Sequence, residues 1–130
     1  MRALLDANVL VRHFTGTPPG QAGRATAFLS EAEELGLVDV VLAETVYVLQ
    51  SVYGMSRDQV AVLMRAVVAY PSVVVDDIDI VLRSLRLYQV ERLDFVDAYL
   101  VAVAESTGVG VVASFDRAID RVGTVERIEP

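Results

Sequence analysis

Short apolar runs alternate with helical segments along almost the whole chain, and this alternation is the feature that most limits its fold. Runs typical of strands occupy residues 2–6, 37–43, 72–75 and 110–114, and residues 124–129 form a possible edge strand. Strands that alternate with helices imply a mostly parallel sheet with helices on both faces. We therefore predict an α/β fold with a mostly parallel sheet of four to five strands.

The segments between these runs carry apolar residues at helical spacing. Helices are predicted over residues 7–14, 21–35, 44–53, 56–70 and 94–106, with another after the acids at 76–79 and a short one over 115–123. Ser56 is a candidate N-cap, Pro71 interrupts the pattern, and Gly36 and Gly108 are candidate helix ends. No linker or repeat interrupts the pattern, so residues 1–130 are predicted to form a single domain.

Composition removes several kinds of chemistry. The chain has no cysteine and no lysine, and its single histidine is His13. Thiolate sites, a Schiff-base lysine and a multi-histidine zinc site are therefore excluded. The net charge of -7 argues against a general nucleic-acid coat but not against a nuclease, because clustered acids that bind a divalent cation reverse the local charge.

The apolar runs are too short to span a membrane. Charges interrupt each run before the roughly 18 residues that a membrane helix needs, and the N-terminus lacks a basic start followed by an apolar signal segment. We therefore expect no membrane association and a cytoplasmic location.

Acidic residues follow several of the predicted strands. Asp6, Glu44 and Asp116 come after the first, second and fourth strands, and ligands of open parallel sheets bind beyond these carboxyl ends. Asp94 and Asp97, three residues apart, share one face at the start of a predicted helix. Helix capping explains Glu44, Asp94 and Asp116 singly, whereas Asp6 is expected to be a costly carboxylate at the end of a buried strand. Together the acids would repel one another unless a cation joined them. Mg²⁺ and Mn²⁺ prefer such oxygen ligands.

The order of the segments "LLDANVL", "VLAETVYVL", "LDFVDAYLVAVAESTG" and "VVASFD" resembles the PIN domain nucleases, and closely the VapC-type toxins of bacterial toxin-antitoxin pairs. The resemblance covers nearly the whole chain. It implies a PIN-like three-layer α/β/α fold and an endoribonuclease, a hydrolase that uses one or two Mg²⁺ or Mn²⁺ ions. The implied catalytic and metal-binding residues are Asp6, Glu44, Asp97 and Asp116.

Further polar residues are predicted to assist this site. By resemblance, Asn8 and Ser114 lie near the metal, and Ser114 orients Asp116 by a hydrogen bond. Asp94 is a helix cap first and an auxiliary acid second. Asp120 is a further outer ligand or a solvent-facing helix acid. A water activated by metal would attack the phosphate, which predicts 5′-phosphate and 3′-hydroxyl products.

RNA and protein partners follow from the same reasoning. Arg12, His13 and Arg117 are weak candidates for contacts with RNA phosphates, and solvated surface is the alternative. The helices over residues 44–70 carry apolar side chains on more than one face, which either the core or a partner must cover. The resemblance implies that the partners are a cognate antitoxin and a second copy in a homodimer.

Three other interpretations remain open at this point. Asp77 and Asp79 could form a Toprim-type metal pair, although helix capping explains them more simply. The chain could be a housekeeping PIN nuclease of RNA processing. It could also be a non-catalytic binding module whose acids only cap helices, in which case magnesium would not raise its melting temperature.

Overall fold

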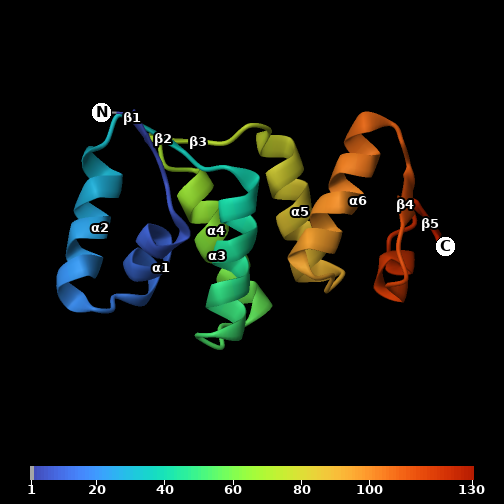
Figure 1. Cartoon of the computed structure of the whole chain (residues 1–130), viewed down its shortest axis with the longest axis horizontal. Coiled ribbons are helices and arrows are strands. Elements are labelled where there is room, and N and C mark those ends of the chain that lie inside the picture. The colour runs from blue at the N-terminus through green and yellow to red at the C-terminus, as the bar shows by residue number, and fades with distance from the viewer. Residues whose placement is uncertain (1) are drawn as a thin grey trace. The chain divides into compact units, whose positions relative to one another are not determined.

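Parallel strands organise both parts of the structure, a computed structural model that describes residues 2–130 (Figure 1). The chain divides into two units, Met1–Asp76 and Asp77–Pro130. Every strand pairing in the described residues is parallel, as predicted, and the strands belong to one three-stranded and one two-stranded sheet.

The sheet of the first unit has the strand order β1-β2-β3. Its strands are β1 (Arg2–Leu4), β2 (Glu34–Gly36) and β3 (Val73–Val74). Leu35 of the central strand pairs with Ala3 and Val73 and is fully buried. Gly36 follows it, and a Cβ at that position would lie 2.8 Å from Cδ2 of Leu4, so a residue with a side chain there would require the exposed Leu4 side chain to shift.

Four helices complete the first unit: α1 (Ala7–Thr15), α2 (Pro19–Glu31), α3 (Asp39–Ser51) and α4 (Arg57–Val68). Helix α1 packs against α2 and α3, and α3 packs against α4 in a hairpin visible in Figure 1. The predicted cap of α4 is confirmed, because the hydroxyl of Ser56 accepts a hydrogen bond from the backbone N–H of Gln59.

The second unit contains α5 (Ile78–Val90), α6 (Phe95–Thr107), β4 (Val111–Ala113), the 3₁₀ helix η1 (Arg117–Arg121) and β5 (Glu126–Ile128). Helices α5 and α6 pack together through fully buried residues that include Leu85, Tyr88 and Val101. Strand β4 pairs with β5, which confirms the expected edge strand. Gly108 ends α6 in the left-handed conformation (φ 76°), also as predicted.

Two boundaries of the first unit differ from the prediction. Helix α2 ends at Glu31 rather than at residue 35, and the strand expected over 37–43 lies at 34–36 instead. Helix α3 already begins at Asp39. Leu42, Val46 and Leu49 explain the shift, because all three are buried at helical spacing, and this packing outweighs the strand preference of the valines before them.

No helix in residues 2–130 combines the length and apolar character needed to cross a membrane.

Candidate metal centre

Three carboxylates of the second unit come together: those of Asp94, Asp97 and Asp116. Each offers one oxygen, and the three oxygens all lie within 4.8 Å of one another. Asp94 and Asp116 are exposed and Asp97 is half-buried. Across the described residues 2–130, this is the group of acids whose spacing suits a shared cation.

Helix α6 supplies two of these acids. Asp94 occupies its N-cap position and Asp97 lies in its first turn, so the three-residue spacing places both on one face, as predicted. Asp94 makes no capping hydrogen bond with its side chain, and its carboxylate instead belongs to the cluster. Phe95 and Ala98 are buried. Because α6 buries the face that carries Phe95 and Ala98, the face that carries Asp94 and Asp97 is directed toward solvent.

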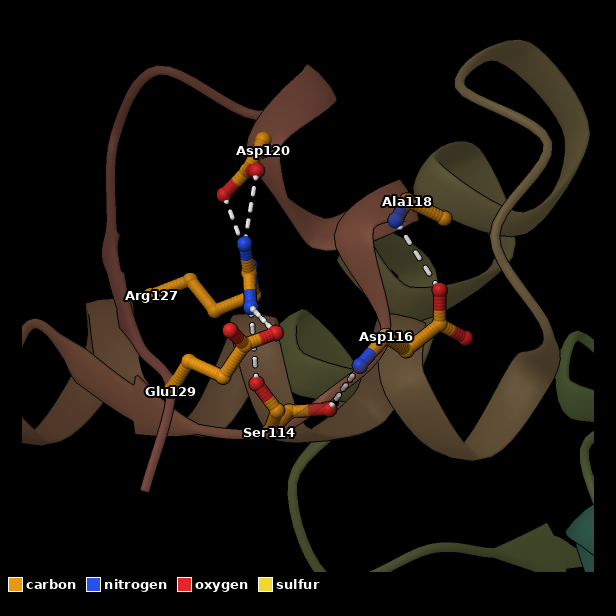
Figure 2. Close-up of polar contacts among 6 residues, drawn as sticks. All are labelled: Ser114, Asp116, Ala118, Asp120, Arg127 and Glu129. Carbon is orange, nitrogen blue, oxygen red and sulfur yellow. Dashed lines mark hydrogen bonds and ion pairs between the residues drawn. The ribbon is translucent and has the colours of Figure 1, made fainter.

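Asp116 reaches the cluster from the turn after β4. The hydroxyl of Ser114 accepts a hydrogen bond of 2.9 Å from the backbone N–H of Asp116 (Figure 2). One carboxylate oxygen of Asp116 accepts a 2.9 Å bond from the N–H of Ala118, so Asp116 is the N-cap of η1. Ser114 thus orients Asp116 through its backbone. Asp116 therefore both caps η1 and belongs to the acidic cluster.

Arg127 on β5 holds the same turn from the other side. Its guanidinium donates to both carboxylate oxygens of Asp120, at 2.9 and 3.1 Å, and to the carbonyl oxygen of Ser114 at 2.9 Å (Figure 2). The Arg127 side chain is only 11% exposed. Asp120 is 55% exposed, but the bidentate geometry of the pair still fixes the orientation of the guanidinium. Asp120 therefore has Arg127 as its partner, and Arg127 positions the turn that carries Asp116.

Sequence reasoning missed Arg127. Asp120 was recognised as an acid one turn beyond Asp116, but nothing in the local pattern around Arg127 indicates which side chain it contacts. The parallel register of β4 and β5 pairs Val112 with Arg127 and so brings the guanidinium to the end of β4.

The cluster perturbs the titration of its members. Desolvation raises the pKa of Asp97 to about 6, and the hydrogen bond to Asp116 and the charges of Asp116 and Asp94 act in the same direction. The pKa of Asp116 is lowered, first by the N–H of Ala118 and then by the hydrogen bond with Asp97. The charges of Asp94 and Asp116 thus add to the desolvation of Asp97, and a bound divalent cation would offset both effects.

The raised pKa of Asp97 predicts that, without metal, the wild type and Asp97→Asn differ in stability by an amount that depends on pH. Because the pKa of Asp97 is raised from 3.8 to about 6, its contribution to stability is complete below the lower value and is lost as the pH rises through about 6. Relative to the wild type, the free energy of unfolding of Asp97→Asn should rise by about 1 kcal/mol as the pH goes from about 4.5 to about 7.5, allowing for solvent screening. Urea unfolding of both proteins in chelator at the two pH values measures this change. A stability difference that is the same at both pH values would contradict the expectation.

The remaining predicted acids, Asp6 and Glu44, belong to the first unit. Asp6 is exposed and is the N-cap of α1, with one oxygen accepting a 2.7 Å bond from the N–H of Ala7. The first strand was expected to be buried, but Arg2 and Leu4 at its ends are exposed. Glu44 is an exposed residue within α3 rather than the residue after a strand, because α3 begins five residues earlier, at Asp39.

The residues expected to assist in the first unit have local partners. Arg12 donates to the carbonyl oxygen of Asn8 at 3.3 Å and to the side chain of Gln21. The two ring nitrogens of His13 are bonded to the hydroxyls of Thr26 and Tyr70, at 2.8 and 3.1 Å. His13 therefore links α1 to α2 and to the residue Tyr70.

Two other predicted residues lie in the second unit. Arg117, a candidate for RNA contacts, is exposed in η1 next to Asp116. Asp77 caps α5, with one oxygen accepting bonds from the N–H groups of Asp79 and Ile80 at 3.0 and 3.2 Å. Capping thus accounts for the acid pair that suggested a Toprim-type site.

The donor set of the cluster suits a divalent metal ion. Three carboxylates are hard oxygen ligands of the kind that Mg²⁺ and Mn²⁺ bind, with water completing the shell. The raised pKa of Asp97, caused first by desolvation and then by its acidic neighbours, is consistent with a position where a cation would stabilise the ionised carboxylate.

Comparisons with known proteins identify the family of the chain. The sequence matches the PIN domain family over residues 3–125, which spans parts of both units. A solved structure described as VapBC2 from Rickettsia felis bound to a DNA fragment from their promoter aligns with 99% of this chain and 98% of that chain, at 12% identity and a TM-score of 0.39. No curated protein matches the sequence. The family match confirms the predicted PIN-like α/β/α fold class, and the chain belongs to the PIN domain family, whose members are generally nucleases.

Proposed function

We propose that this protein is a metal-dependent endoribonuclease and the toxin of a toxin-antitoxin pair. The observation that supports the proposal most is the cluster of Asp94, Asp97 and Asp116 in a chain of the PIN domain family. We propose further that residues 1–130 act as one PIN domain, to which Asp6 and Glu44 contribute catalytic acids. The support for Asp6 and Glu44 is the order of the sequence motifs.

In this proposal Asp97 and Asp116 hold one or two Mg²⁺ or Mn²⁺ ions, with Asp94 as an auxiliary acid. The metal supplies charge stabilisation and lowers the pKa of a coordinated water. Asp116 can bind with one oxygen while Ala118 holds the other, so its carboxylate is oriented before a ligand arrives. Ser114 and Arg127 keep the turn fixed. The resemblance of the segment "LLDANVL" supports Asn8 as an auxiliary residue of the site.

No side chain of the chain needs to act as the nucleophile. Cysteine and lysine are absent, and His13 has partners on both ring nitrogens. Hydrolysis by water leaves a 3′-hydroxyl on the fragment that lies 5′ of the cut and a 5′-phosphate on the fragment that lies 3′ of it.

The function is tested by incubating the pure protein with single-stranded and structured RNAs, in Mn²⁺, in Mg²⁺ or in chelator. We expect cleavage only with metal, products with 5′-phosphate ends, and a melting temperature raised by Mn²⁺. A binding module would show neither the cleavage nor the shift. A housekeeping nuclease would cleave in the same way but would not be neutralised by any co-expressed antitoxin.

The hairpin of α3 and α4 supports the proposal of an antitoxin partner and a homodimer. Val46, Leu49 and Met64 are buried, but Tyr47 and Val62 are 66% and 61% exposed. Large apolar side chains on an outer face favour a partner surface. We expect the protein to bind a hydrophobic dye, or to migrate as a dimer, and to lose this behaviour in Tyr47→Ser/Val62→Ser. A monomer that does not bind dye would contradict this part of the proposal.

A further inference from the structure

A groove in the first unit lies between α1 and α2 and shares no residue with the acidic cluster. Two guanidinium groups and two carboxamides line it together with one aromatic ring; its lining residues are Asn8, Val9, Arg12, Gln21, Arg24, Ala25 and Phe28. Its volume is about 410 Å³, which falls within the range of about 300–1,000 Å³ for small-ligand sites. The groove is thus large enough to receive part of an extended chain.

The groove is cationic in an acidic protein. The net charge of the chain is -7, yet no acidic residue occurs between Ala7 and Ser30, the segment that supplies every lining residue. Arg12 and Arg24 therefore face the ligand without a carboxylate among the residues that line the groove. A local positive potential of this kind attracts phosphate groups.

Local contacts prepare Arg12 for such a ligand. Its Nε donates to Gln21 of α2 and its NH1 group donates to the carbonyl oxygen of Asn8 of α1 at 3.3 Å, so the guanidinium is held between the two helices. A guanidinium oriented in this way loses little side-chain freedom when it binds a phosphate. Arg24, one turn along α2 from Gln21, is exposed and can reach a second phosphate.

Phe28 and the carboxamides indicate which anion fits. Phe28 is only half-buried, although a phenylalanine on a packed helix can usually bury its ring. An accessible ring beside arginines is the arrangement on which single-stranded nucleic acids stack their bases. The amides of Asn8 and Gln21 add donors and acceptors for base edges. An acidic peptide would use the arginines but would gain nothing comparable from the ring.

We infer that the groove between α1 and α2 binds single-stranded RNA, with Arg12 and Arg24 on its phosphates and Phe28 stacked on a base. The inference rests on the proposed function, because it names the surface that holds the substrate of the nuclease. It does not depend on the metal, since no lining residue belongs to the cluster of Asp94, Asp97 and Asp116.

The test measures binding of a short fluorescent single-stranded RNA by anisotropy, in chelator and at low salt, so that nothing is cleaved. Arg24→Gln and Arg12→Gln should each weaken binding, and the double variant should reduce the slope of log affinity against log salt by roughly 1.4. Phe28→Leu should weaken binding by about five- to hundredfold. Arg86→Gln, which removes the same charge from an exposed position on α5, is the matched control and should bind like the wild type.

Two further measurements separate this inference from the proposed function. The groove variants should keep the melting temperature shift caused by Mn²⁺, whereas Asp97→Asn should lose that shift and keep RNA binding. Arg24 is exposed, so Arg24→Gln remains informative even if Arg12→Gln does not fold. Equal binding of RNA by the wild type, Arg24→Gln and Phe28→Leu would overturn the inference that the groove binds RNA. Displacement of RNA by an acidic peptide that binds more tightly would overturn it as well. Absence of cleavage despite normal groove binding would instead overturn the nuclease.

Discussion

Asp97→Asn is expected to lower Mn²⁺-dependent RNA cleavage by at least about a hundredfold. The estimate takes the upper end of the loss caused by removing residues that only support a metal ligand, because Asp97 is proposed to bind the metal directly. One of its carboxylate oxygens lies within 4.8 Å of an oxygen of Asp94 and of an oxygen of Asp116. Asparagine has nearly the same shape but lacks the charge, so the folded structure should persist.

The same substitution should stabilise the protein when metal is absent. Asp97 has a pKa raised to about 6, so at neutral pH it is ionised at a cost to the folded state. A variant that is more stable without metal, insensitive to Mn²⁺ and inactive would show that the site sacrifices stability for function. Loss of activity that accompanies loss of folding would carry no such meaning, and circular dichroism distinguishes the two results.

Asp77→Asn is the matched control for Asp97→Asn. It removes one negative charge from the N-terminus of a helix of the same unit, and Asp77 caps α5 without belonging to the cluster. Asparagine caps helices about as well as aspartate, so both stability and cleavage should be preserved. Cleavage that survives in Asp97→Asn, or that is lost equally in Asp77→Asn, would contradict the assignment of the site.

Leu85→Ala is expected to destabilise the protein by about 2–5 kcal/mol. Leu85 lies on α5 and has 0% exposure in the contact with α6, the helix that carries Asp94 and Asp97. Alanine would leave a cavity that the two helices can close only by moving. For a chain of this length a loss near 3 kcal/mol corresponds to a fall in melting temperature of roughly 10 °C.

Leu82→Ala provides the comparison for Leu85→Ala on the same helix. Leu82 is 39% exposed, so its removal transfers less apolar surface to water and leaves no enclosed cavity. Its cost should be about 1 kcal/mol or less. Calorimetry on both variants measures the difference, and equal costs would show that α5 does not bury Leu85 as described.

Local patterns of the sequence were reliable where a single element decides the outcome. The cap at Ser56, the end of α6 at Gly108 and the shared face of Asp94 and Asp97 depend on residues only a few positions apart. The error at residues 37–43 arose where a local pattern was ambiguous. A short apolar run with valines suits a strand or a buried helix, and only the burial of Leu42, Val46 and Leu49 on one face decides for α3.

By itself, the sequence determined the alternation of strands and helices, and it determined that acids are present while cysteine and lysine are absent. It also determined that Asp94 and Asp97 share one face of a helix, because helix geometry sets the positions of residues three apart. Only the tertiary structure decided that Asp116 joins Asp94 and Asp97, that Arg127 fixes the turn that carries Asp116, and that α1 and α2 line a groove with two arginines. These contacts join residues that are distant in the chain, and they depend on the register of β4 with β5 and on helix packing, which no local spacing encodes.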